Sequence, residues 1–147
     1  MTEPVDRTDS SQTDSISFEF DLPHAPEVVW RALTEPDLLR QWLLPATGFK
    51  LEAGAAFTFE TDPHPGWDGT VSCRIVEIEP YRRISYSWSV PFLDTVVTFT
   101  LSPTPSGTRM LLEQRGFKPS QKQALGGARY GWRMMGAKLS DLLEAGV

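Results

Sequence analysis

The chain is poor in the residues that build most metal and redox sites. Cys73 is its only cysteine, and His24 and His64 are its only histidines, in a sequence of 147 residues. A single cysteine excludes an internal disulfide and the cysteine-rich zinc sites. His64 lies between Asp62 and Asp68, a spacing that could hold a metal ion, but loop residues of these types are more often turn formers and solvated groups. We therefore expect no metal ion and no cofactor.

Positive charge and long apolar runs are scarce as well. The chain has 14 Lys and Arg against 19 Asp and Glu, a net charge of -5, and no basic run. This composition disfavours nucleic acid and membrane surfaces as partners. No run approaches the ~18 apolar residues of a membrane-spanning helix, and the first residues lack the apolar centre of a signal peptide. We expect a cytoplasmic monomer or homodimer in which residues 1–15 form a disordered tail.

Apolar and polar residues alternate in six segments, which predicts strands with one buried face. In one of them the apolar parity changes at Ile75 and Val76, and this change predicts a β-bulge that bends the sheet. Proline and glycine in residues 62–69 predict a loop. The predicted strands cover residues 16–22, 57–60, 71–78, 84–88, 95–101 and 108–115.

Two short helices and one long helix complete the predicted elements. Pro26 suits the first turn of a helix after the first strand, and Thr34 suits the start of a second. From Ser120 to the C-terminus, apolar residues recur at steps of three and four, with Ser120 and Gln123 as a capping box and Gly146 as a stop signal. The apolar stripe of this helix contains Leu125, Ala128, Trp132, Met135, Leu139 and Leu142.

Together these elements predict one α+β domain over residues 16–147. A curved antiparallel sheet of about six or seven strands would wrap around the long C-terminal helix, with the two short helices after the first strand.

The inward faces of these elements carry many rings, which line either a small-molecule cavity or an ordinary core. In a cavity, Tyr86, Gln114 and Cys73 would be the few polar contacts. Trp42, followed by Leu43-Leu44-Pro45, would lie at a pocket mouth or in a docking patch, or would simply close the core. The candidate ligand-binding residues are Trp42, Phe57, Phe59, Cys73, Tyr86, Trp88, Phe99, Met110, Leu112, Gln114, Trp132 and Met135.

The sequence shows no catalytic motif. It lacks a nucleophile elbow and a phosphate loop, and Glu113 has the outward parity of its strand. Cys73 has only Arg74 beside it to lower its pKa, and Arg74 points to the opposite face, so a buried, unreactive thiol is favoured. We assign no catalytic residue.

Several motifs, in this order, resemble the SRPBCC or START-like superfamily, within it the homologues of the heat-shock-protein-90 ATPase activator. They are VWRALTEPDLLRQWL at 29–43, VEIEPYRRISYSW at 76–88, VTFTLSP at 97–103, GTRMLLEQRGF at 107–117 and GW at 131–132. The resemblance implies a helix-grip fold enclosing a pocket for lipids, sterols or polyketides. This branch often carries a histidine where the chain has Gln114, and its loop corresponding to residues 62–69 is usually shorter.

Three functions remain open. The favoured one is a non-enzymatic module that binds a small, largely apolar molecule, as carrier, sensor or sequestering protein, with Tyr86 or Gln114 bonding to a hydroxyl or carbonyl group. The second is a protein-interaction module related to chaperone activators, which would use the outer sheet face or residues 42–45. The third is a polyketide cyclase or hydratase acting through Tyr86.

Overall fold

A computed structural model describes residues 4–8, 14–63 and 65–146 and has the predicted α+β, helix-grip architecture. The chain order is strand, two short helices, six strands and one long helix, with a two-residue strand in front. The elements are β1 (Val5–Asp6), β2 (Ser15–Leu22), α1 (Pro26–Thr34), α2 (Pro36–Trp42), β3 (Ala46–Thr47), β4 (Ala56–Glu60), β5 (Thr70–Glu79), β6 (Arg83–Val90), β7 (Leu93–Thr104), β8 (Gly107–Arg115), η1 (Pro119–Gln121) and α3 (Lys122–Glu144).

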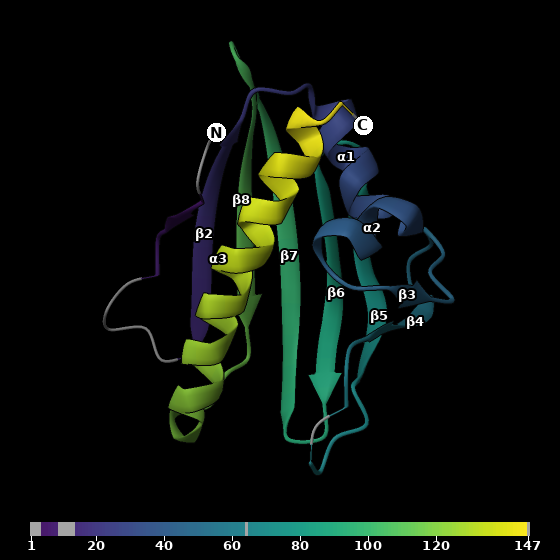
Figure 1. The fold of residues 1–147 in the computed structure, drawn as a ribbon, viewed down its shortest axis with the longest axis vertical. Helices are drawn as coiled ribbons and strands as arrows, with labels where there is room; N and C mark the ends of the chain where they lie inside the picture. Colours follow the sequence, from purple (N-terminus) through teal and green to yellow (C-terminus); the bar gives the residue numbers. More distant parts are fainter. Residues whose placement is uncertain (1–3, 9–13, 64, 147) are drawn as a thin grey trace.

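All strands belong to one antiparallel sheet in the order β1-β2-β8-β7-β6-β5-β4-β3. This sheet has more strands than the six or seven predicted, because the two-residue strands β1 and β3 extend its two edges. The helices lie on one face, with α3 running diagonally across the sheet and α1 and α2 beside its C-terminal half (Figure 1). None of the helices in the described residues lies on the opposite face.

The predicted bulge in β5 is confirmed. Ile75 is paired with Tyr86 of β6, but the next pair joins Glu77 to Ser85, so Val76 is the additional residue and its side chain is exposed. Before the bulge, Val71, Cys73 and Ile75 are buried, as their shared parity predicts. The bulge bends β5 and helps the sheet curve around α3.

Helix α3 begins later than predicted, and its capping differs from the predicted box. Pro119 starts a 3₁₀ turn, and the side-chain oxygen of Gln121 accepts a hydrogen bond of 2.8 Å from the backbone N–H of Lys118. The predicted capping box of Ser120 and Gln123 is therefore wrong. Because the first turn starts at Pro119, the free backbone amides of the helix start lie further upstream than predicted, and the Gln121 side chain caps the N–H of Lys118. Gly146 follows the last helical turn with a φ of 89°, as the stop signal predicts.

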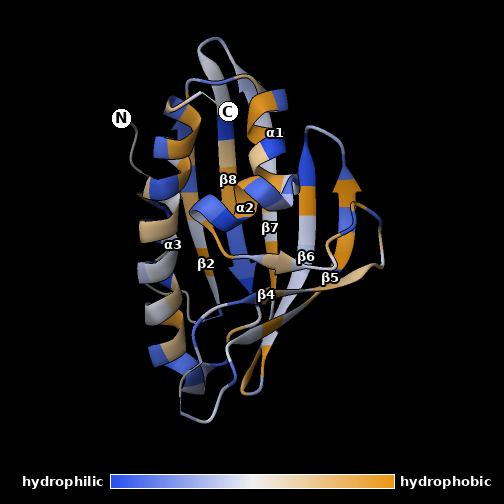
Figure 2. Ribbon diagram, turned by 45° about the vertical axis from the view of Figure 1, so that its right-hand side comes forward, coloured by the Kyte–Doolittle hydropathy of each residue, from blue (hydrophilic) through white to orange (hydrophobic). Residues whose placement is uncertain are grey.

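The buried side of α3 lies mainly in its C-terminal half. The predicted stripe is only half-buried at Leu125 and Ala128, and the first fully buried residue is Trp132. Figure 2 shows hydrophilic residues recurring along α3 between hydrophobic ones. At Gly136 the helix is so close to β2 that an added Cβ would lie 2.7 Å from the Phe20 ring.

The short helices α1 and α2 cover one end of the space between the sheet and α3, and we call this space the grip. Thr34 ends α1 instead of starting α2, and its hydroxyl donates to the Trp30 carbonyl. Pro36 takes the first position of α2, where its missing N–H costs nothing. The described part of the chain has no helix with the length and apolar character needed to cross a membrane.

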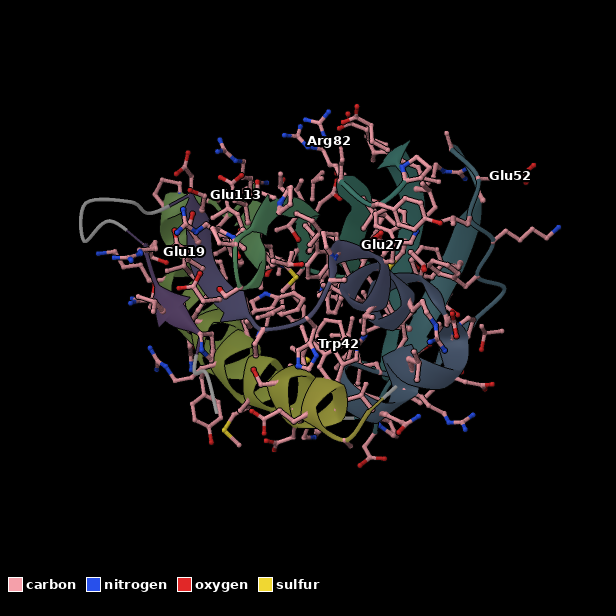
Figure 3. All side chains as sticks on the ribbon, turned by 90° about the horizontal axis from the view of Figure 1, so that it is seen from above. Glu19, Glu27, Trp42, Glu52, Arg82 and Glu113 are labelled. Carbon is pink, nitrogen blue, oxygen red and sulfur yellow. The ribbon has the colours of Figure 1, made fainter. Side chains whose placement is uncertain are left out.

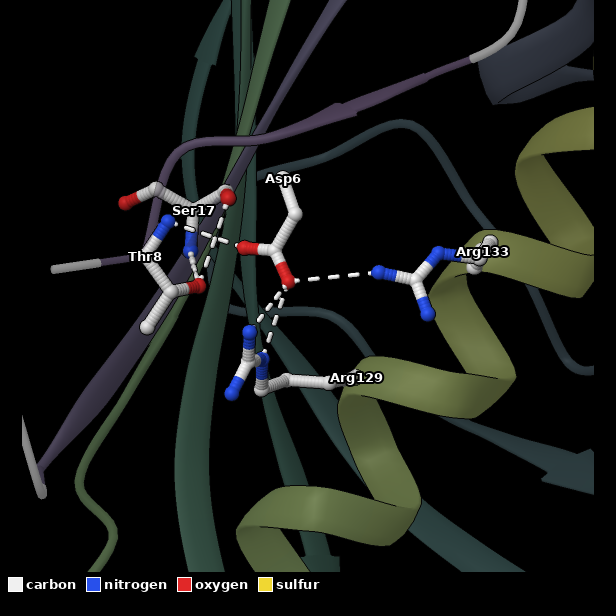
Figure 4. A network of polar contacts seen from close by, with 5 residues as sticks. All are labelled: Asp6, Thr8, Ser17, Arg129 and Arg133. Atoms are coloured by element: carbon white, nitrogen blue, oxygen red, sulfur yellow. Dashed lines mark hydrogen bonds and ion pairs between the residues drawn. The ribbon is translucent and has the colours of Figure 1, made fainter. Parts of the chain in front are cut away.

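Residues 4–8 have a place in the fold that the predicted tail did not give them. Val5–Asp6 pair with β2, and Asp6 accepts hydrogen bonds from Arg129 at 2.6 Å and from the Thr8 N–H at 2.9 Å, with Arg133 at 3.5 Å (Figure 4). Backbone pairing and charge hold this segment against β2 and α3. Of the other residues in the predicted tail, Ser15 begins β2 and the Asp14 carbonyl accepts from the Gly116 N–H, whereas residues 1–3 and 9–13 lie outside the described residues.

Candidate ligand-binding site

Seven aromatic side chains from five elements meet between the sheet and the helices, and we call them the aromatic cluster. They approach one another as tilted or edge-to-face pairs, the arrangement that ring quadrupoles favour. Ring centroids lie 5.3 Å apart for Phe57 and Tyr86, 5.4 Å for Phe59 and Trp88, and 5.7 Å for Trp88 and Trp132. The cluster contains Trp42, Phe57, Phe59, Tyr86, Trp88, Phe99 and Trp132.

A buried chain of hydrogen bonds joins α3 to three strands beside the cluster. The indole N–H of Trp132 donates to the Gln114 carbonyl oxygen at 2.8 Å, and the Gln114 amide donates to the Thr95 hydroxyl at 2.9 Å. Thr95 in turn donates to the Trp88 carbonyl at 2.9 Å. Gln114 is 2 % exposed, so its amide serves the fold and is not free for a ligand unless α3 moves.

Tyr86 lies at the centre of the cluster with only 1 % of its surface exposed. Burial, with a smaller effect of the neighbouring Cys73, raises the pKa of Tyr86 well above its usual value. No hydrogen bond joins its hydroxyl to any other residue that the structure describes. The side chain is thus a neutral phenol among rings, but its oxygen is not fully enclosed, because His24 Nε2 is the only fully buried side-chain N or O atom without a partner among the described residues.

Cys73 is buried beside Tyr86, and burial raises the pKa of its thiol to about 12. Its Sγ lies 3.8 Å from the Val71 carbonyl oxygen, and a backbone hydrogen bond with Phe59 offsets a small part of the rise in pKa. A protonated, buried thiol is a poor nucleophile. The structure therefore supports an unreactive Cys73.

Trp42 closes the core. Its indole N–H donates to the Ala32 carbonyl at 2.8 Å, and its ring meets Phe99 edge-on at 6.2 Å. Figure 3 shows Trp42 inside the molecule, whereas Glu19 and Glu113 lie at the periphery. Because Leu43 is buried too, residues 42–45 do not form the exposed docking strip considered from the sequence.

The remaining candidates extend the core from the cluster towards β2. Leu112 is paired with Phe18 on one side and Phe99 on the other, and Met110 with Phe20 and Leu101. Both are buried, whereas Met135, almost one turn beyond Trp132, is half-buried. All three pack as core residues in this conformation.

The space inside the grip is filled by these side chains. Four recesses of 360 to 600 Å³ open at the surface of the described structure, and Phe57 and Cys73 are the only candidate residues that line any of the four. A ligand inside the grip would therefore have to displace rings. Aromatic packing of this density could not be distinguished from a cavity by periodicity alone.

Sequence reasoning did not select Thr95 as a site residue. Its signal was present, because Thr95 shares the inward parity of Val97 and Phe99, where a hydroxyl needs a buried partner. His64 lies outside the described residues, so the spacing with Asp62 and Asp68 stays untested. Among the residues that are described, no group of three His, Cys, Asp or Glu side chains could hold a metal ion.

Comparison with known proteins agrees with this architecture. The model of the family "Activator of Hsp90 ATPase homolog 1-like protein" matches residues 23–144. The crystal structure of MLL2253 from Mesorhizobium loti is similar with a TM-score of 0.84 and 39 % identity, over 90 % of this chain and 98 % of that protein. A search among curated proteins gave no match.

Two further solved structures share the fold. CalU16 from Micromonospora echinospora has a TM-score of 0.77 and 26 % identity, over 100 % of this chain and 76 % of that one. DynU16, from the dynemicin biosynthetic locus, has a TM-score of 0.78 and 20 % identity, and the match covers 92 % of this chain but 49 % of DynU16. The family match and the likeness to MLL2253 show that the chain belongs to the activator of Hsp90 ATPase homologue 1-like family of the SRPBCC superfamily.

Proposed function

We propose that the chain binds a small, largely apolar molecule between the sheet and the N-terminal half of α3. The observation that carries this proposal is the Tyr86 side chain, which is 1 % exposed among rings and whose hydroxyl bonds to no other described residue. Buried polar groups normally have partners, and a ligand carbonyl or hydroxyl would supply one. The rings around Tyr86 would desolvate the apolar part of the ligand at about 25 cal/mol per Å².

Ligand access requires movement, and the first half of α3 is suited to it. Residues 122–131 contain no fully buried side chain and include Gly126, Gly127 and Gly131. Glycine lowers helix stability, and segments with few buried contacts open at low free-energy cost. Outward movement of this half would expose Trp88 and Trp132 to a ligand.

Binding is favoured over the cyclase or hydratase alternative by the chemistry of the same residues. A general base needs a pKa near the working pH, and the pKa of Tyr86 is raised far above it. The amide of Gln114 is occupied by Trp132 and Thr95. We therefore infer a carrier, sensor or sequestering protein in which Tyr86 orients the ligand.

A second candidate function is docking to a chaperone ATPase, in keeping with the family name. Tyr130 and Met134 lie one turn apart on the outer side of α3 and are 64 % and 49 % exposed. An exposed apolar pair of this kind suits a protein contact. Binding of this type would survive filling of the grip and would be lost in a Tyr130→Ser, Met134→Ser double variant.

The test is isothermal titration of the full chain with oleate, cholesterol and naringenin. We expect saturable binding of at least one compound and a loss of about three- to tenfold in affinity in Tyr86→Phe, which removes one hydrogen bond but keeps the ring. Tyr130→Phe is the matched control and should bind like the parent chain. Absence of binding by all three, or equal affinity of the parent and both variants, would contradict the proposal.

A further inference from the structure

A recess of about 500 Å³ opens on the sheet face opposite α3, and we call it the outer recess. Ser72 and Arg74 of β5 alternate with the buried Val71 and Cys73, so their side chains point to this outer face. Four strands, β3, β4, β5 and β6, contribute hydroxyl groups to it. The outer recess is lined by Thr47, Ala56, Phe57, Thr58, Ser72, Cys73, Arg74, Ser87 and Ser89.

The outer recess coincides with an interruption between β5 and β6. Ser72 is paired with Ser89, and the next paired residues are Ile75 and Tyr86. Between these pairs the backbone N–H of Arg74 donates to the Ser87 side-chain hydroxyl at 2.9 Å. A side chain thus occupies the place of a ladder acceptor, and the hydrogen atom of that hydroxyl is left to donate into the recess.

Arg74 brings a positive charge that no carboxylate of the described chain neutralises. Its Nη1 donates to the Gly54 carbonyl at 2.6 Å, which fixes the guanidinium at the rim. No ion pair involves Arg74 among the residues that the structure describes. Since a guanidinium has five N–H donors, four remain available.

The hydroxyl groups of the outer recess add further donors. Thr58 and Ser72 make no side-chain hydrogen bond to another described residue, whereas Ser89 donates to Asp94 at 2.6 Å. Among the described residues, Arg74 is the only charged one that lines the recess. The recess therefore offers one fixed cation and several neutral donors, the chemistry that recognises carboxylate and phosphate oxygens.

We propose that the outer recess is a second binding site, specific for a compact molecule that carries an oxyanion, either a carboxylate or a phosphate group. Arg74 would hold the anion, and Ser72, Ser87 and Thr58 would donate to its remaining oxygens. The site is separate from the grip, because Ser72 and Arg74 point away from the buried face of β5. Helix α3 lies across the other face of the sheet (Figure 1).

The test uses the ¹⁵N-labelled full chain, titrated at constant ionic strength with phenyl phosphate, benzoate and neutral benzyl alcohol. We expect saturable shifts of the Ser72, Arg74, Ser87 and Ser89 amides with one or both anions and none with benzyl alcohol. The stronger of the two anions identifies the oxyanion class. These probes do not depend on ligand binding in the grip, so the two proposals can fail separately.

Arg74→Ala should weaken anion binding about tenfold or more, because hydrogen bonds to a charged group are lost. Arg82→Ala is the matched control, since Arg82 is also exposed and makes no ion pair with a described residue. Ser72→Ala, an exposed substitution that leaves the Gly54 contact intact, should weaken binding several-fold. No saturable shift, equal loss in the Arg82 control, or unchanged binding in both Arg74→Ala and Ser72→Ala would overturn the proposal.

Discussion

Gln114 satisfies two buried partners with one side chain. Trp132 and Thr95 both depend on its amide, so removing the amide leaves an indole N–H without an acceptor in the core. We predict that Gln114→Met, which keeps the chain length, lowers the free energy of unfolding by about 1–3 kcal/mol. Urea unfolding followed by circular dichroism measures this difference.

The control for this substitution is Gln123→Met on the exposed side of α3. Its effect on unfolding should be within about 0.5 kcal/mol of zero. Equal stability of Gln114→Met and the parent chain would mean that the buried hydrogen-bond chain does not contribute to stability.

Sequence parity identified most individual residues of the grip. Phe57, Tyr86 and Phe99 each occupy the inward position of an alternating strand, and each joins the aromatic cluster. Parity could not say whether these rings surround a space or fill it, because this depends on how side chains from five elements interlock. The hydrogen-bond partners of Gln114 could not be predicted from parity either, because Thr95 and Trp132 lie on separate elements.

Among the elements, α3 docks on β2 through a glycine. Gly136 has no room for a Cβ beside Phe20 and Pro4, whereas a Cβ at Gly127 would have no described atom within 4 Å apart from its chain neighbours and the nearby backbone of its own helix. We predict that Gly136→Ala lowers the free energy of unfolding by about 1–3 kcal/mol through overpacking. Gly127→Ala should raise it by about 0.5–1 kcal/mol through helix propensity.

Thermal and urea unfolding of the two glycine variants test this contrast, because the same substitution is made in the same helix. If both substitutions raised the free energy of unfolding, the prediction would be wrong: Phe20 would move aside to accept the added methyl group at no cost in stability.

The segment of residues 4–8 is tied to α3 by charge. Asp6 is 14 % exposed; partial burial pushes its pKa up, but hydrogen bonds from Thr8 and Arg129 outweigh this, so the pKa lies below the ordinary 3.8. Because the folded-state pKa of Asp6 is lowered, the ionised carboxylate stabilises the fold at any pH above the ordinary pKa. This stabilisation is lost as the pH falls through the folded-state pKa. Asp6→Asn should therefore cost about 0.5–1.5 kcal/mol at pH 7 and progressively less below pH ~4.

Urea unfolding of the parent chain and Asp6→Asn across this pH range gives the difference directly. Asp37→Asn is the control, because Asp37 pairs with Arg40 in an exposed position and should change stability little at any pH. A cost of Asp6→Asn that stays constant with pH would show that the carboxylate charge is not involved.

Residues 4–8 make long-range contacts that local sequence patterns cannot predict. Asp6 and Arg129 are 123 positions apart, and a two-residue strand has too few residues for a periodic signal. The six longer strands, the helices and the bulge in β5 have such signals and were predicted. Element ends were less certain, because a proline near the start of α2 and of α3 changed the first turn.

In the whole molecule, stability is expected to be uneven along α3. From Trp132 onward the helix buries Trp132, Leu139 and Leu143, whereas residues 122–131 contain no fully buried side chain. We predict that amides of residues 124–131 exchange with solvent through local opening and those of residues 136–143 only through near-global unfolding. Hydrogen exchange by NMR tests this, and equal protection along α3 would rule out its first half as the mobile wall of the grip.

The resemblance to a superfamily and the periodicity of the sequence predicted the same global arrangement. The motifs at 29–43 and 76–88 carried the helix-grip fold, and the family match over residues 23–144 agrees with it. Whether side chains fill the grip could not be predicted from the family resemblance, because related chains can place rings of different size in the same fold.

The most direct test of ligand binding in the grip is the indole region of the ¹H–¹⁵N spectrum during titration of the full chain with oleate, cholesterol and naringenin. We predict saturable shifts of the Trp88 and Trp132 indoles with at least one compound, while the Trp30 indole, which packs against Tyr81 at 6.0 Å, stays in place. Unchanged Trp88 and Trp132 signals with all three compounds would contradict binding of such molecules between the sheet and α3.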